Sequence, residues 1–159
     1  NSSEYDKVIS YINNYGIKKI ELNLLDNLTL GSIDISTLSP PDNYIINSSD
    51  ILNSNSTIYQ ILTKKHNILF LGDSTKETEK YLINNINSNL LLNVDILQVG
   101  HHGSNTSTSD ILLKNINFAT AIISSKKSVY GHPSIETLDI LKKYNFEVKI
   151  TEKDGAIKF

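Results

Sequence analysis

Two stretches decide the fold of this chain: Leu69-Phe70-Leu71-Gly72-Asp73 and Val99-Gly100-His101-His102-Gly103-Ser104. Each contains an apolar run, which is typical of a parallel strand buried on both faces. In each, the run is followed by glycine and a possible metal ligand. Open α/β sheets place their chemistry outside the carboxyl ends of such strands. We therefore expect the carboxylate of Asp73 and the imidazoles of His101 and His102 to share one site.

The composition is that of a globular domain. The 159 residues suffice for one hydrophobic core, and 39% of them are hydrophobic against 20% charged. No apolar run approaches the roughly 20 residues that span a bilayer, and no signal segment opens the chain. Because cysteine is absent, His, Asp, Glu and Asn are the possible metal ligands. A net charge of −2 gives no broad basic surface, so any contact with nucleic acid has to be local.

The pattern of apolar residues changes at Asp73. Before it, a helix over residues 3–15 precedes β-like runs, and a polar break at residues 64–67 has the length of a hairpin turn. After it, helices and strands alternate, which predicts an α/β fold with helices packed on one side of a sheet. The expected strands are residues 17–22, 28–30, 33–38, 56–63, 68–71, 94–99 and 118–124, with a final pair around residues 152–155, and the expected later helices are residues 75–86, 109–116 and 134–144.

The candidate metal ligands each have a second, purely structural explanation. Asp73 can cap the helix that follows it, with or without a metal, since a carboxylate accepts from free amides at a helix start. His101 and His102 can be ordinary loop residues. Neutral imidazole suits zinc, manganese or iron, and Gly100 and Gly103 let the backbone approach a ligand closely.

The residues around these ligands suit an anionic substrate. Ser104 and Asn105 open a run of small and hydroxyl-bearing residues that leads into a helix, which favours a phosphate. His132 lies in a turn stiffened by proline and can ligate metal, donate a proton or hold the turn. Lys127 can steer an anion, although charged loops are usually only solvated. We expect His66, in the hairpin connection, to be exposed and without function.

Four motifs in this order resemble the C-terminal part of the metallo-β-lactamase-like domain of ComEC-type competence proteins: residues 70–73, residues 94–104, Tyr130-Gly131-His132-Pro133 and Asp154-Gly155. The resemblance covers nearly the whole chain, from the loop near Ser39 to the last strand. It implies an αββα sandwich, here incomplete, with a mixed sheet and helices on one face. It also implies a metal-dependent phosphodiester hydrolase, a nuclease that degrades one DNA strand during uptake.

Carried over by position, the resemblance assigns metal ligands. Asp73 matches the carboxylate that bridges two divalent ions, zinc or manganese, and His101 or His102 matches a late histidine ligand. The superfamily's His-x-His-x-Asp-His signature is absent and would lie upstream of Asn1. We therefore expect residues 1–159 to be a single unit, the C-terminal portion of the hydrolase fold, which holds only part of a two-metal site and binds metal weakly alone.

The same resemblance completes the expected site. In the whole domain, two ions would activate a water and stabilise charge on the phosphate, with His132 donating a hydrogen bond or proton. The substrate would be single-stranded DNA or another phosphodiester. The expected catalytic residues are Asp73, His102 and His132, and the expected substrate-binding residues are Ser104, Asn105 and Lys127.

The resemblance also implies a membrane-embedded parent protein with this domain on its extracellular face. Two other functions stay open at this point. One is a surface phosphoesterase of the same fold, of the choline-phosphate type. The other is a metal-free relative that serves as a binding or scaffold domain, because the signature that carries most ligands is absent.

Overall fold

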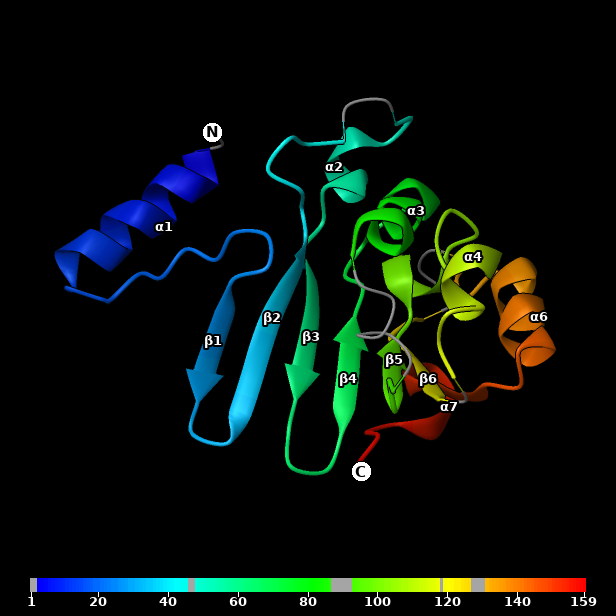
Figure 1. The fold of residues 1–159 in the computed structure, drawn as a ribbon. Helices are drawn as coiled ribbons and strands as arrows, with labels where there is room; N and C mark the ends of the chain where they lie inside the picture. The colour runs from blue at the N-terminus through cyan, green and yellow to red at the C-terminus, as the bar shows by residue number, and fades with distance from the viewer. Residues whose placement is uncertain (1–2, 46–47, 87–92, 118, 127–130) are drawn as a thin grey trace.

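One seven-stranded sheet organises the molecule (Figure 1), and its strands lie side by side in chain order. The computed structural model describes residues 3–45, 48–86, 93–117, 119–126 and 131–159. Strands β1 to β4 pair antiparallel, whereas β4 to β7 pair parallel. The strands are β1 Asn27–Leu30, β2 Ile33–Ser39, β3 Ile58–Leu62, β4 Asn67–Phe70, β5 Ile96–Gln98, β6 Thr120–Ile123 and β7 Glu147–Ile150.

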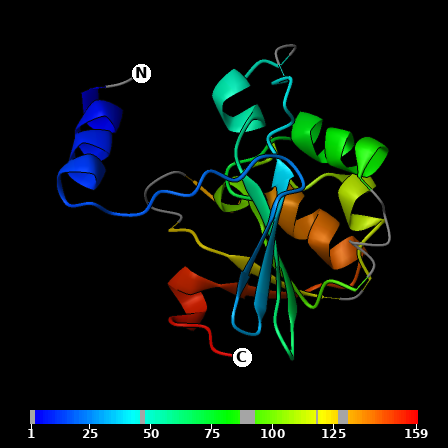
Figure 2. The same ribbon diagram turned by 60° about the vertical axis from the view of Figure 1, so that its left-hand side comes forward.

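Helices connect the parallel strands, because a parallel pair needs a crossover connection. Helix α3 (Lys76–Asn85) joins β4 to β5, α4 (Asp110–Leu113) joins β5 to β6, and α6 (Ile135–Lys143) joins β6 to β7. Figure 2 shows these three helices on one face of the sheet. The other helices in the described part of the chain are α1 Ser3–Asn14, α2 Ile51–Ser54 and α7 Thr151–Asp154, and Gly100–Gly103 form a tight turn.

The hydrophobic core lies between the parallel strands and these helices. Its side chains are almost completely removed from water, which is the main favourable contribution to folding. Leu69, Leu97, Ala121 and Ile123 face it from β4, β5 and β6, and Leu82, Leu112, Leu113 and Leu141 face it from the three helices.

The predicted fold class is confirmed. The mixed sheet with helices on one face supplies one β layer and one α layer, as expected of an incomplete αββα sandwich. Helix α1 and the strands expected near residues 28–30, 33–38, 56–63, 68–71, 94–99 and 118–124 are present. The bounds of α1, β3, β5 and β6 are shorter than expected, β1 and β2 are each one residue longer, β4 is shifted by one residue, and Phe118 lies outside the described residues.

Two local predictions are wrong. Residues 17–22 form no strand and pair with none of the described strands, and Ile17 and Ile20 are exposed. Of the strand pair expected around residues 152–155, one strand is present as β7, but it pairs with β6, and the residues after it form helix α7 rather than a hairpin turn. Its first turn is closed by Asp154, whose carboxylate accepts from the amide of Ile150 at 2.7 Å, a local bond that competes with strand pairing. None of the described helices is long and apolar enough to cross a membrane.

Candidate functional site

Four predicted site residues meet at the carboxyl edge of the parallel strands. Asp73 follows β4, His101 and His102 follow β5, and His132 lies between β6 and α6. Their side chains line one pocket of about 220 Å³. The four side chains come from three loops that are up to 59 positions apart in the sequence, and parallel pairing brings the loops to one edge. This is the placement that the sequence predicted for them.

The central contact of the pocket joins His102 and Asp73. The Nε2 atom of His102 lies 3.7 Å from Oδ1 of Asp73, and both side chains are about half exposed. The Nδ1 atom of His102 lies 2.7 Å from the carbonyl oxygen of Ser124. A carbonyl only accepts, so Nδ1 carries the hydrogen, and a neutral His102 presents the lone pair of Nε2 on the side of Asp73. This is how protein ligands to metals are usually held.

The other two histidines complete the pocket wall. The His101 ring lies 6.5 Å from that of His102 and 6.0 Å from that of His132, measured between centroids. The Nδ1 atom of His101 is 3.2 Å from the hydroxyl of Thr106. Burial, together with the nearby His101 and His102, lowers the pKa of His132. His132 is therefore neutral near pH 7, with one nitrogen that donates and one that accepts.

The histidines sit on a strained turn. Both His101 (φ 47°) and His102 (φ 56°) have left-handed backbone conformations, which cost roughly 1–2 kcal/mol per residue for side chains other than glycine. Hydrogen bonds hold the turn in place: the His101 amide donates to the Gly72 carbonyl and the Ser134 amide to the Gly103 carbonyl, both at 2.9 Å. Such strain clusters at functional sites, where surrounding structure enforces it.

Two glycines allow the three loops to come this close. A Cβ on Gly103 (φ +82°) would lie 2.7 Å from Cβ of Pro133, so the turn that carries His132 packs directly on the histidine turn. A Cβ on Gly72 (φ +57°) would lie 3.0 Å from the carbonyl oxygen of Thr57. The chain therefore needs glycine at both positions, for its conformation and for its small volume.

Sequence reasoning missed two polar residues that brace the site. The side-chain oxygen of Gln98 accepts from the amides of Leu71 and Gly72 at 3.1 Å each, and its amide nitrogen donates to the Val99 carbonyl at 2.6 Å. Gln98 thus fixes the end of β4, and Asp73 beyond it, to β5. Its interruption of the apolar run in residues 96–99 was the available signal.

Glu79 is the second missed residue. It is fully buried, and its two carboxylate oxygens accept from the amides of Thr108 and Ser109 at 2.6 Å each. Burial raises its pKa, while the hydrogen bonds from Ser109 and Thr108 lower it by less. Nothing in the local sequence indicates this burial, because an acid in the first turns of a helix is normally solvated and favoured by the helix dipole.

Two of the predicted substrate-binding residues, Ser104 and Asn105, do not line the histidine pocket. Ser104 is buried, its hydroxyl lies 3.0 Å from the hydroxyl of Thr106, and its carbonyl accepts from Thr137. Asn105 is exposed and lines a separate small cavity beside Lys76. Lys127 lies outside the described residues.

The pocket residues fit part of a metal site. Two ligands bound to zinc at about 2.0–2.1 Å with tetrahedral geometry are about 3.4 Å apart, close to the 3.7 Å between His102 Nε2 and Asp73 Oδ1. However, no group of three or more possible metal-ligating side chains is arranged to hold an ion within the described parts of the chain. Zinc needs three or four ligands, so these residues supply at most a portion of a centre.

Comparison with known proteins identifies relatives in bacterial competence. No family model matches the chain. ComE operon protein 3 of Bacillus subtilis is 29% identical over 157 residues, 97% of this chain and 19% of that protein. Recombination protein 2 of Haemophilus influenzae is 34% identical over 107 residues, 67% of this chain and 13% of that protein. Competence protein ComA of Neisseria gonorrhoeae is 27% identical over 128 residues, 80% of this chain and 18% of that protein.

Among solved structures, a mutant of the CmlA beta-hydroxylase aligns with a TM-score of 0.42 and 14% identity, covering 89% of this chain and 27% of the other. The chain spans less than a fifth of the length of each of the three competence-related relatives. Their similarity confirms the resemblance stated from the motifs: the chain is a relative of the ComEC-type competence proteins and matches one part of their length.

Proposed function

We propose that the chain is the C-terminal portion of a metallo-β-lactamase-like domain that hydrolyses a phosphodiester, single-stranded DNA during competence DNA uptake. One observation carries the proposal: Asp73 and His102 face one pocket 3.7 Å apart, and the Ser124 carbonyl fixes the ring of His102 for ligation through Nε2. In this proposal the remaining metal ligands come from outside the chain. The parent protein is membrane-associated, with this domain on its extracellular face.

Each pocket residue has a role in the proposed reaction. Asp73 Oδ1 and His102 Nε2 are the ligand atoms, and the braced turn keeps them in position. When bound, a divalent ion, zinc or manganese, supplies an activated water and positive charge near the phosphate. His132, whose pKa is lowered, donates a hydrogen bond from its neutral ring to a phosphate oxygen or to the leaving oxygen. Ser104 acts indirectly, by holding the loop that contains Thr106.

The test measures metal uptake and cleavage separately. Zinc and manganese are titrated calorimetrically into the wild type, Asp73→Ala and His102→Ala, with Asp42→Ala as a matched exposed control. Cleavage of labelled single-stranded DNA is then measured on the protein that contains the chain. We expect both site variants to lose about 100-fold or more in metal affinity and cleavage, and the control to lose neither. Undiminished cleavage in both site variants would sink the assignment.

A scaffold function is the second candidate, because the described residues contain no complete group of metal ligands. A metal-free binding domain would take up no stoichiometric zinc or manganese, even within its parent protein. The calorimetric titration therefore separates the two functions. Cleavage of a small choline-phosphate ester with DNA left intact would instead indicate a surface phosphoesterase.

A further inference from the structure

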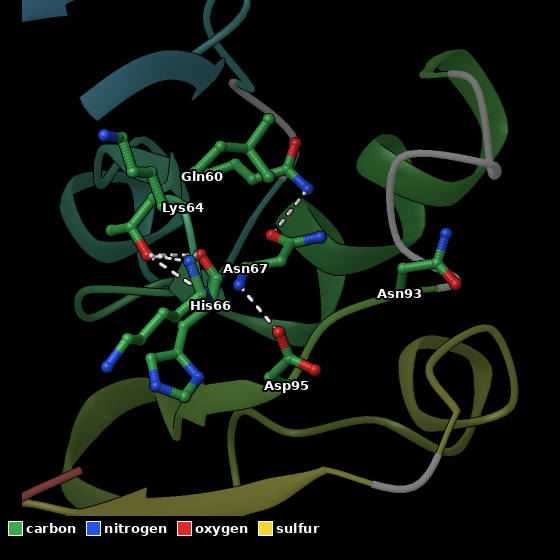
Figure 3. Close-up of a pocket in the computed structure, with 9 residues that line it drawn as sticks. Gln60, Lys64, His66, Asn67, Asn93 and Asp95 are labelled. Atoms are coloured by element: carbon green, nitrogen blue, oxygen red, sulfur yellow. Dashed lines mark hydrogen bonds between the residues drawn. The ribbon is translucent and has the colours of Figure 1, made fainter. Parts of the chain in front are cut away.

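A second pocket lies at the opposite end of β4 from the histidines (Figure 3). It has a volume of about 450 Å³, within the range of small-molecule sites. Asn67 begins β4 in this pocket, and Asp73 lies three residues beyond the end of β4 at Phe70, so at most about 20 Å of extended chain separates the two residues. The pocket is therefore separate from the candidate metal site. Its lining includes Gln60, Leu62, Lys64, Lys65, Asn93 and Asp95.

The turn that forms one side of this pocket is built around a single hydroxyl. Oγ1 of Thr63 accepts from the amides of Lys65 at 3.2 Å and His66 at 2.9 Å, and it donates to the His66 carbonyl at 3.1 Å. The Thr63 amide donates to the same carbonyl at 2.9 Å. The backbone is thus preformed, and it presents the adjacent lysines Lys64 and Lys65 at the tip of the turn.

The floor of the pocket carries amide groups in fixed positions. Gln60 is 2% exposed, and its side-chain nitrogen donates to Oδ1 of Asn67 at 3.0 Å. The carboxylate of Asp95 accepts from the Asn67 amide at 2.8 Å, so one of its oxygens is bonded to the main chain. Asn93 adds a further exposed amide (Figure 3). Amides offer both donors and acceptors, which is what the edges of nucleobases require.

His66 differs from its expected state. It is half-buried rather than exposed, and its ring makes an edge contact with that of Phe159 at 6.3 Å between centroids. Its ring and the side chain of Leu62 give the pocket an apolar and planar surface beside the amides. Bases of unpaired strands are commonly held by such flat side chains. Two ammonium groups at the rim suit the phosphate that is attached to the base.

We propose that this pocket binds one nucleotide unit of single-stranded nucleic acid, with the phosphate at Lys64 and Lys65 and the base against the amides of Asn67 and Asn93. The choice of a polynucleotide rests on the proposed phosphodiester hydrolase function. The site supplies the local contact that a chain of net charge −2 requires. A nucleic-acid strand that occupies this pocket and the histidine pocket together runs the length of β4 and its following loop, at most about 20 Å, so it contains several nucleotides.

The test measures binding without cleavage. Fluorescence anisotropy follows a labelled, short oligothymidine strand bound to the 159-residue chain in the presence of a metal chelator. The double variant Lys64→Gln/Lys65→Gln is compared with Lys80→Gln/Lys142→Gln, which removes the same charge from exposed lysines on α3 and α6. We expect the first pair to weaken binding about tenfold at low salt and to reduce the salt slope by about two, and the second pair to change affinity less than about twofold.

A second variant tests the base contact. Asn93→Ala weakens binding of the strand and leaves the salt slope unchanged, because it removes no charge. Equal losses in the two lysine pairs, or full competition by inorganic phosphate alone, would overturn the nucleotide site. Because no metal is needed, a wild type that binds the strand but never cleaves it refutes only the hydrolase proposal. A wild type that cleaves, with unaltered binding by the Lys64 and Lys65 variant, refutes only the nucleotide site.

Discussion

The parallel and antiparallel halves of the sheet differ in how much apolar surface they cover. In the parallel half, β4 to β7, crossover helices lie over the strands and bury leucine and isoleucine side chains almost completely. In the first 62 residues, most large apolar side chains of α1, β1 and the adjoining loops are exposed, and α1 buries no residue at all. The parallel connections supply covering helices, whereas the short β1–β2 and β3–β4 turns supply none and the β2–β3 connection has only the four-residue α2.

The candidate metal site lies in the well-covered half. Its strained histidine turn is held by hydrogen bonds to the β4 loop and to the turn before α6, and these elements are anchored in the core. A left-handed pair of non-glycine residues needs such support, because its conformation opposes folding by itself. We therefore expect the same substitution to lower the free energy of unfolding more in the parallel half than in the antiparallel half.

The largest expected difference comes from a matched leucine pair. Leu97 in β5 is completely buried, whereas Leu30 in β1 is 55% exposed. We expect Leu97→Ala to lower the free energy of unfolding by about 2–5 kcal/mol, through lost burial and a residual cavity. Leu30→Ala should change it by about 0.5 kcal/mol or less. Urea denaturation measures both variants. Equal losses of unfolding free energy would show that Leu30 is packed in a core as well as Leu97 is.

A matched glycine pair sharpens the comparison at the site. Gly103 and Gly31 both have positive φ, but a Cβ on Gly31 meets no atom within 4 Å. Gly31→Ala should therefore cost only the backbone conformation, about 1–2 kcal/mol. Gly103→Ala adds overpacking against Pro133, for about 2–4 kcal/mol in total. If the two variants unfold at the same urea concentration, the close packing of the histidine turn on Pro133 adds nothing to the cost of the Gly103 substitution in unfolding free energy.

The sequence predicted the parallel half well because its signals are local. Helix α6 begins where Ser134 can cap it, and the Ser134 side chain does accept from the Thr137 amide at 3.1 Å. The gathering of Asp73, His101, His102 and His132 followed from one rule, since the carboxyl ends of neighbouring parallel strands share an edge. Their chemical roles remain proposals.

Long-range features could not be predicted. The left-handed conformations of His101 and His102 depend on the β4 loop and on Pro133, and a positive φ is ordinarily expected at glycine or asparagine. Residues 17–22 have a strand-like pattern but no pairing partner in the described sheet. The bracing contacts of Gln98 join residues 26 and 27 positions apart, and its place in an apolar run marks Gln98 as unusual without indicating which amides it contacts.

Glu79 gives the smallest effect and tests the support of the loop that carries Thr106, the partner of His101. Replacing its carboxylate by an amide puts a donor opposite one of the amides of Thr108 and Ser109. Glu79→Gln should change the free energy of unfolding by about 1 kcal/mol at a given pH. Glu77→Gln, exposed in the same first turn of α3, is the matched control and should have no measurable effect.

The pH dependence of this variant reveals which form of Glu79 the fold prefers. Because burial raises its pKa in the folded state, the protonated carboxyl stabilises the fold below the unfolded pKa of about 4.3, and this contribution is lost as the pH rises through the folded value. Urea denaturation from pH 4 to pH 7 should therefore show the wild type losing stability relative to Glu79→Gln. The opposite trend would mean that the hydrogen bonds from the two amides, at 2.6 Å each, stabilise the carboxylate by more than its removal from water costs, so that Glu79 is a buried anion.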